Sequence, residues 1–237
     1  MTGATESAIA AGLARVRARI ARAAEAAGRD PASVRLIAVG KLQPLESLRA
    51  ALDAGQRALG ENYAQELRDK AEALAVHDPA PEWHFLGALQ TNKVKYVVGR
   101  AALVHTCDRL ALAQELSRRA AAQGVVQRVL VEVNLGREPQ KGGVAPEALP
   151  DLLDALADLP GLRCEGLMCI PPAVGDPRAH FAALRELRDA TRARAPSSVE
   201  LDELSMGMSA DYEAAIAEGA TLVRVGTAIF GERPRKG

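Results

Sequence analysis

The segment VRLIAVGK, residues 34–41, predicts a buried strand that ends in a lysine. Residues 36–40 carry no charge, which is typical of a parallel strand covered on both faces. A doubly wound dinucleotide-binding fold would place a GxGxxG turn directly after such a first strand, and this chain has none there. The segment therefore favours a different parallel α/β fold.

Seven more short apolar runs follow, and amphipathic segments with helical spacing separate them. The eight expected strands are residues 34–40, 57–60, 83–87, 103–106, 129–135, 162–170, 199–204 and 221–225. The expected helices between them are residues 45–54, 64–76, 91–97, 109–123, 146–159, 177–195 and 209–218. This alternation predicts a single α/β domain, a (β/α)8 TIM barrel, with an open doubly wound sheet as the alternative.

We expect the barrel to run from about residue 34 to about residue 231 of one domain, residues 1–237. An extra helix at about residues 6–27 precedes it, and we expect this helix to cover the bottom of the barrel.

Composition excludes several classes of protein. The chain has 237 residues with 30 Lys and Arg against 30 Asp and Glu, which argues against a basic nucleic-acid footprint. No apolar run approaches the roughly 18–20 residues of a membrane span, and no secretory signal precedes the first helix. Three cysteines without a CxxC pair predict reduced thiols and a cytoplasmic protein. Four histidines without metal-ligand spacing predict no metal site.

The chain has only six lysines, and one of them follows the first strand. Lys41 would enter the mouth of the barrel, where desolvation lowers the pKa of an amine and favours a Schiff base with a carbonyl compound. The alternative is a lysine that extends its ammonium group into solvent. Lys70 is expected on a solvated helix face, and the others are expected at the surface or in loops: Lys93, Lys95, Lys141 and Lys236.

The loops after the seventh and eighth strands suit a phosphate. Ser209 lies in the first loop, and Gly226 and Thr227 lie in the second, where a short helix can begin. These two loops form the recurrent phosphate site of TIM barrels. The alternative is that Ser209 caps the next helix and that Gly226 and Thr227 form a simple turn.

A lysine amine and a phosphate site together suit a phosphorylated aldehyde, either pyridoxal phosphate (PLP) or a sugar phosphate in a Schiff-base aldolase. Arg224 lies within the apolar eighth run, and an inward arginine can donate to a pyridine nitrogen and disfavour its protonation. The alternative is a buried ion pair between this arginine and an inward acid such as Glu132, Glu165 or Asp202.

Several motifs in order resemble those of the YggS/PROSC family, the pyridoxal phosphate homeostasis proteins. They are AVGK at residues 38–41, GENYAQE at 60–66, WHFLGALQTNK at 83–93, GLM at 166–168, LSMGMSADYEAAI at 204–216 and RVGTAIFG at 224–231. The resemblance implies a single fold-type III barrel like the N-terminal domain of alanine racemase. One departure is Gly40, where the family usually has serine, and it removes a hydroxyl beside the lysine.

The resemblance also implies a cofactor and its ligands. PLP would form an internal aldimine with Lys41, and its pyridine nitrogen would face Arg224. Its phosphate would lie against four residues of the last two loops: Ser205, Ser209, Gly226 and Thr227. Asn62 would lie near the ring, and Met168, in a matching motif, belongs to the same cofactor-binding set. A secondary role in cofactor exchange is implied for Lys93 or Lys141.

Related racemases need a second base, a tyrosine from a separate β-domain of a partner subunit. This chain ends shortly after residue 231, and Tyr63, Tyr96 and Tyr212 fall at no obvious second-base position. We therefore expect a monomeric cytoplasmic PLP-binding protein of vitamin B6 homeostasis, with no catalytic residues. Its implied partners are PLP-dependent apoenzymes or enzymes of vitamin B6 salvage. The alternative is a PLP-dependent amino-acid racemase, and a cofactor-free aldolase is a third class.

Overall fold

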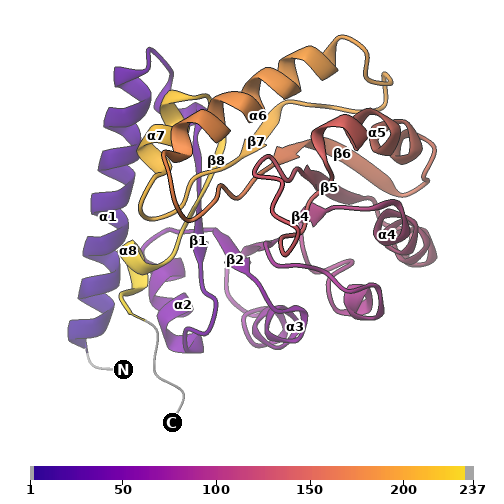
Figure 1. Ribbon diagram of the computed structural model, residues 1–237. Helices are drawn as coiled ribbons and strands as arrows, with labels where there is room; N and C mark the ends of the chain where they lie inside the picture. Colours follow the sequence, from indigo (N-terminus) through magenta and orange to yellow (C-terminus); the bar gives the residue numbers. More distant parts are fainter. Residues whose placement is uncertain (1–2, 233–237) are drawn as a thin grey trace.

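Eight parallel strands close into a barrel in the computed structural model, which describes residues 3–232 (Figure 1). The strands are β1 (Arg35–Val39), β2 (Ala58–Glu61), β3 (Glu82–Phe85), β4 (Leu103–Cys107), β5 (Gln127–Glu132), β6 (Leu162–Met168), β7 (Glu203–Ser205) and β8 (Leu222–Val225). Each strand pairs with its neighbour in sequence, and β1 pairs with β8 through the register Ile37 to Arg224. The predicted TIM barrel is confirmed, and the open doubly wound sheet is excluded.

Helices connect the strands and form the outer layer. The α-helices are α1 (Gly3–Ala26), α2 (Leu45–Asp53), α3 (Ala64–Ala73), α4 (Leu110–Gln123), α5 (Leu149–Ala157), α6 (Pro177–Arg192), α7 (Tyr212–Ala217) and α8 (Thr227–Phe230). Three short 3-10 helices are η1 (Pro31–Ser33), η2 (Thr91–Tyr96) and η3 (Pro146–Ala148). Apolar residues on the inner faces of these helices pack against the outside of the barrel and form the larger part of the core.

Most helix and strand boundaries lie within a few residues of those predicted from the sequence, and three segments differ. The seventh strand is shorter than expected because its pairing with β6 begins only at Glu203. Residues 91–96 form a 3-10 helix, whereas an α-helix was expected. The helix expected from Ser209 begins at Tyr212 with Asp211 at its N-cap position, and Ser209 makes a contact with another loop that is described below.

A small apolar cluster fills the inside of the barrel. It consists of Ile37, Ala58, Leu86, Leu103, Leu130, Met168 and Leu222. The side chain of Met168 belongs to this cluster and is 1% exposed.

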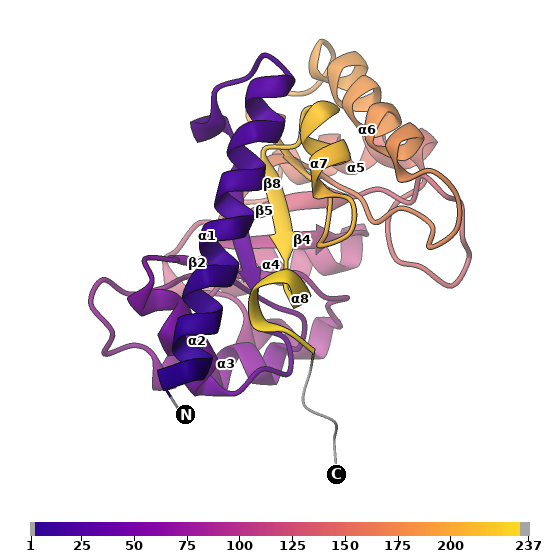
Figure 2. The same ribbon diagram turned by 90° about the vertical axis from the view of Figure 1, so that its left-hand side faces the viewer.

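The first helix is part of the outer ring. Helix α1 packs on α2, α7 and α8, and Figure 2 shows it running beside α8 along the barrel. Gly12 permits this approach, because a Cβ atom there would lie 2.9 Å from the carbonyl oxygen of Ile229. The expectation that this helix covers the bottom is wrong: α8 has only four residues, and α1 takes the place of a longer final helix.

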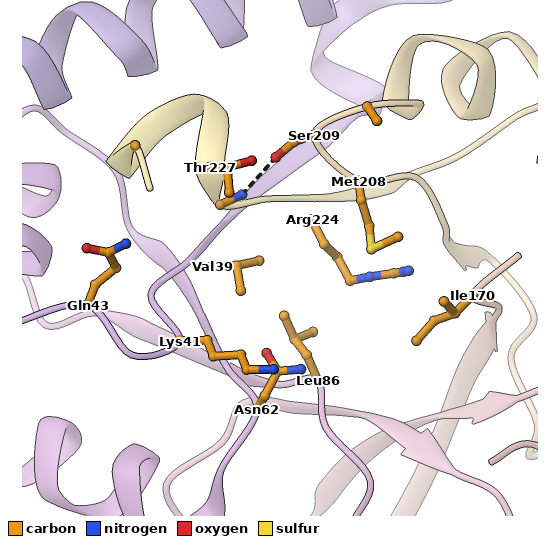
Figure 3. A pocket seen from close by; sticks show the side chains of 13 residues that line it. Val39, Lys41, Gln43, Asn62, Leu86, Ile170, Met208, Ser209, Arg224 and Thr227 are labelled. Carbon is orange, nitrogen blue, oxygen red and sulfur yellow. Dashed lines mark hydrogen bonds between the residues drawn. The ribbon is translucent and has the colours of Figure 1, made fainter. Parts of the chain in front are cut away.

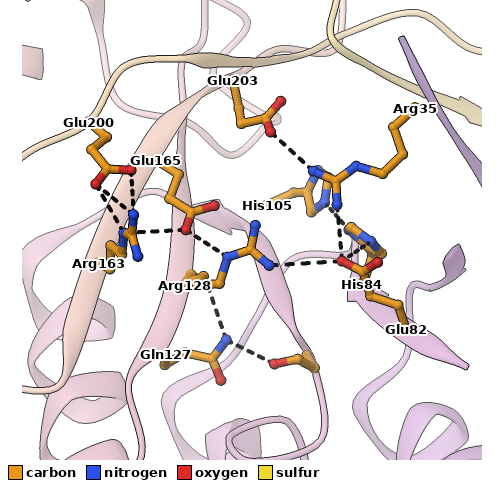
Figure 4. Close-up of polar contacts among 11 residues, drawn as sticks. Arg35, Glu82, His84, His105, Gln127, Arg128, Arg163, Glu165, Glu200 and Glu203 are labelled. Carbon is orange, nitrogen blue, oxygen red and sulfur yellow. Dashed lines mark hydrogen bonds and ion pairs between the residues drawn. The ribbon is translucent and has the colours of Figure 1, made fainter. Parts of the chain in front are cut away.

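Charged side chains gather instead at the N-terminal ends of the strands, at the bottom of the barrel (Figure 4). Arg35 bridges Glu82 at 3.1 Å and Glu203 at 3.0 Å, and Arg128 pairs with Glu165 at 2.6 Å. These pairs satisfy strand-end charges that would otherwise face an apolar interior.

Candidate functional site

A cavity of about 370 Å³ opens at the C-terminal ends of the strands, and we call it the barrel-mouth cavity. It falls within the usual size range of cofactor pockets. Figure 3 shows most of its side chains converging from β1, from β8 and from the segments that follow β1, β2, β3, β6, β7 and β8. Its lining residues are Val39, Lys41, Gln43, Asn62, Leu86, Ile170, Met208, Ser209, Ala210, Arg224, Gly226, Thr227 and Gly231.

Six of the eight residues expected to bind the cofactor line this cavity: Lys41, Asn62, Ser209, Arg224, Gly226 and Thr227. The other two are Met168 and Ser205, which lie beneath the cavity with their side chains fully buried. The sequence thus predicted the correct loops of the site. It did not predict which side chains of these loops line the cavity and which lie beneath it.

Lys41 projects from the turn after β1, and its Nζ lies 5.2 Å from the centre of the Tyr63 ring. The next residue, Leu42, has a φ of 60°, a left-handed conformation that a side chain other than glycine adopts only where its surroundings hold it. Its N–H donates to Glu66 at 2.8 Å. On the other side, Lys70 donates to the carbonyl oxygen of Gly40 at 2.8 Å. The peptide groups that flank Lys41 are therefore both fixed by α3.

Lys70 is the centre of a buried ion cluster, and the expectation that it lies on a solvated helix face is wrong. Its Nζ is 2.8 Å from Glu61 and 2.6 Å from Glu66. Glu61 is fully buried at the end of β2, and burial raises its pKa to about 7 although Lys70 opposes the shift. Lys70 of α3 points inward because the buried Glu61 carboxylate, at the adjacent end of β2, needs a cation as its partner.

Gly40 makes room for this cluster. A Cβ atom at residue 40 would lie 2.9 Å from Glu61 Oε1 and 3.0 Å from a methyl group of Leu48. A serine here would require both neighbours to shift. The departure from the usual family residue is therefore linked to the packing of Glu61 beneath Lys41.

The loops after β7 and β8 are joined by one hydrogen bond. The N–H of Gly226 donates to Ser209 Oγ at 3.3 Å, so Ser209 bridges two loops and does not cap a helix (Figure 3). Thr227 begins α8, as expected, and the N–H groups of Ile229 and Phe230 donate to the Gly226 carbonyl oxygen. The hydrogen-bond donors that this end of the cavity offers are therefore the Thr227 N–H and the hydroxyls of Ser209 and Thr227.

Arg224 reaches the cavity from the middle of β8 and is 5% exposed. It donates to Ser205 Oγ at 2.6 Å and to the carbonyl oxygen of Cys169 at 3.0 Å. Burial lowers its pKa, and the nearby Glu132 acts in the opposite direction.

The alternative of an ion pair between Arg224 and an inward acid is wrong for the described residues. Glu165 pairs with Arg128, Asp202 pairs with Arg192, and no hydrogen bond joins Arg224 to Glu132 within residues 3–232. None of these three acids therefore neutralises the Arg224 guanidinium group through an ion pair.

Because Glu132 is buried at the end of β5, we expect the stability of the protein to depend on pH. Burial raises its pKa from 4.5 to about 7, Asp108 adds to the shift, and Arg224 opposes it. The folded state therefore binds a proton that the unfolded state has released, and unfolding free energy falls as pH rises from about 4.5 to about 7. We expect Glu132→Gln to remove about 2 kcal/mol of this fall.

Urea unfolding between pH 5 and pH 8 measures it, with the exposed Glu186→Gln as control. Glu61 also contributes to the slope, so the difference between variant and wild type is the quantity of interest. A difference that does not change with pH would contradict the prediction.

No group of three or more His, Cys, Asp or Glu side chains within residues 3–232 is arranged to hold a metal ion. The three cysteines are unpaired and buried. Among the same residues, every helix is too short or too polar to cross a bilayer.

Comparison with known proteins gives consistent similarities. The family model of the alanine racemase N-terminal domain matches residues 12–234. The pyridoxal phosphate homeostasis protein of Aquifex aeolicus is 48% identical over 224 residues, which cover 93% of this chain and 96% of that protein. The protein of the same name from Escherichia coli K12 is 42% identical over 228 residues, covering 95% and 97%.

Solved structures agree. PipY of Synechococcus elongatus with PLP bound has a TM-score of 0.83 and 38% identity, and the match covers 94% of this chain and all of that one. Alanine racemase from Streptomyces lavendulae has a TM-score of 0.71 at 18% identity, with 58% of that chain covered, which shows a common fold alone.

Proposed function

The chain belongs to the family of pyridoxal phosphate homeostasis proteins, and we propose that it binds PLP reversibly in the barrel-mouth cavity, as a single PLP-binding domain of vitamin B6 homeostasis. The observation that carries this proposal is one cavity lined by the Lys41 amine, the Arg224 guanidinium and the hydrogen-bonded loops of Ser209 and Gly226. An aldehyde, a ring nitrogen and a phosphate are the three groups of PLP that such a set can bind.

Lys41 is the proposed point of covalent attachment. Its amine would condense with the aldehyde of PLP with loss of one water, and hydrolysis of the same bond would return the free amine and release the cofactor. Ser209, Gly226 and Thr227 hold the phosphate, and Asn62 lies beside the ring. Met168 and Ser205 support the site from below, which agrees with their burial.

Arg224 supports a role in binding without a committed reaction. A permanent cation at the pyridine nitrogen disfavours protonation of the ring, and a neutral ring withdraws electrons from a substrate less effectively. The protein would hold the aldehyde of PLP masked and pass the cofactor to other proteins. PLP-dependent apoenzymes and vitamin B6 salvage enzymes are the proposed partners of a cytoplasmic monomer.

Two incubations of the PLP-loaded protein test this function. With an apoenzyme that needs PLP, we expect recovery of that enzyme's activity as the cofactor transfers. With a panel of L-amino acids, we expect no steady formation of D-isomers or keto acids. Steady turnover of any amino acid would overturn the proposal in favour of a racemase or another PLP enzyme.

The phosphate site gives a separate prediction. Ser209→Ala removes both a hydroxyl and the acceptor for the Gly226 N–H, so PLP affinity should fall about fivefold to tenfold. Pyridoxal, which lacks the phosphate, should bind variant and wild type alike. Equilibrium titration of both ligands measures the effect, and an equal loss for pyridoxal would show that Ser209 does not act on the phosphate.

A further inference from the structure

A continuous row of polar side chains runs from the barrel-mouth cavity into the barrel interior. Arg224 donates to Ser205 Oγ at 2.6 Å, Ser205 Oγ is 2.8 Å from His105 Nδ1, and His105 Nε2 is 2.9 Å from His84 Nδ1. Ser205, His105 and His84 are fully buried. We call these four residues the polar column. At its far end, His84 Nε2 lies 3.5 Å from Glu82 Oε1 (Figure 4).

The two ends of the polar column set the direction of its hydrogen bonds. The Glu82 carboxylate only accepts, so a neutral His84 keeps its hydrogen on Nε2, which faces Glu82 at ion-pair distance, and His84 Nδ1 accepts from His105 Nε2. His105 Nδ1 then carries no hydrogen and accepts the hydroxyl hydrogen of Ser205, while Ser205 Oγ accepts from the Arg224 guanidinium group, which only donates. Within the polar column, every hydrogen is thus donated in the direction of Glu82.

This arrangement requires both histidines to be neutral, and their surroundings favour that state. Burial lowers the pKa of His105 well below its ordinary value, and His84, Arg224, Arg35 and Arg128 act in the same direction. Burial also lowers the pKa of His84, although Glu82 opposes the shift.

The polar column ends at a fixed anion. The pKa of Glu82 is lowered to about 2, mainly through its contact with His84. Arg35 lies 3.1 Å from this carboxylate and Arg128 lies 3.8 Å from it. The buried cation at the mouth is thus connected through oriented dipoles to an ionised carboxylate at the bottom.

A polar row of this kind is costly inside an otherwise apolar barrel unless every member has a partner. Its neighbours are apolar, including Ile37, Leu103 and Leu222. When every partner is present, such a network holds its members in one arrangement. The member whose orientation matters for the cavity is Arg224, because it alone among the four lines the barrel mouth.

We propose that Ser205 and His105 are positioning residues, which orient the Arg224 guanidinium so that its free N–H groups face the ring nitrogen of PLP. The inference rests on the proposed function, since that function supplies the ring nitrogen. Two hydrogen bonds, from Nη1 to Ser205 Oγ and from Nη2 to the Cys169 carbonyl oxygen, fix its rotation. Loss of the Ser205 hydroxyl would remove one of these hydrogen bonds and let the planar group turn.

The test compares PLP with its 1-deaza analogue, in which a C–H group replaces the ring nitrogen. Ser205→Ala should weaken PLP binding about tenfold and change the affinity for the analogue less than twofold. Ser209→Ala is the matched control, because a phosphate contact should weaken both ligands equally. An equal loss of both ligands in Ser205→Ala, or no loss of either, would overturn the inference.

A second measurement needs no variant and no cofactor. ¹⁵N NMR of the wild-type imidazoles should show His84 and His105 as neutral Nε2–H tautomers at pH 7, and the chain's four histidines allow assignment by single substitutions. A charged His105, or a hydrogen on its Nδ1, would overturn the inference even if Ser205→Ala fails to fold. Failure of wild-type protein to bind PLP would overturn the proposed function, and with it the ring nitrogen as the target of Arg224, whereas the histidine tautomers would still report the orientation of the polar column.

Discussion

Lys41→Ala is expected to abolish covalent attachment of PLP, and with it the visible absorption band of the loaded protein. Without the amine no C=N bond forms, and the phosphate and ring-nitrogen contacts are left to hold the cofactor. The fold should persist, because Lys41 is half-buried and its described contact is the Tyr63 ring, worth about 0.5–1 kcal/mol.

Absorption spectra and thermal unfolding of the variant measure both effects. Lys93→Ala is the matched control, since the Lys93 ammonium group lies over Tyr96 and outside the cavity lining. This control should keep the band. An unchanged band in Lys41→Ala would show that the attachment site is another lysine.

Lys70→Met is expected to destabilise the protein by about 3 kcal/mol at pH 8. The substitution leaves the Glu61 carboxylate fully buried beside Glu66 without its cation. It also removes the bond to the Gly40 carbonyl, so the turn that carries Lys41 loses one of its two attachments.

Urea unfolding measures the change, and pH dependence identifies its cause. Because the pKa of Glu61 is raised, this carboxyl can take up a proton as the pH falls, and the penalty should shrink at pH 5. Addition of Glu61→Gln to Lys70→Met should restore part of the stability at pH 8. A loss below 1 kcal/mol, or a loss that does not depend on pH, would contradict the role of the cluster.

The fold and the centre of the site could be predicted because their signals are local. An uncharged strand that ends in a lysine selects Lys41, and an arginine within an apolar run selects Arg224. The alternation of short runs and amphipathic segments predicts the barrel. These patterns depend on residues that are close together in the sequence.

The supporting contacts could not be predicted because their partners are distant in sequence. Lys70 has acidic neighbours on its own helix, which indicate a solvated face, and its inward partner Glu61 belongs to a strand end. Ser205 and His105 are 100 residues apart and meet only once the barrel closes. Ser209 has the pattern of a helix cap, and its partner is the N–H of Gly226 in another loop.

The position of α1 illustrates the same limit. Its sequence predicts an amphipathic helix, yet its place depends on α8 being too short to complete the ring. Gly12 leaves room for the contact with α8, and its role becomes apparent only when the two helices are placed side by side.

Reductive trapping tests the central claim most directly. Wild-type protein is incubated with PLP, reduced with borohydride and digested, and the mass of the bound pyridoxyl group is located by peptide mapping among the six lysines. The account predicts one modified peptide that contains Lys41. A label on Lys93, Lys95 or Lys141, or no label above background, would contradict it.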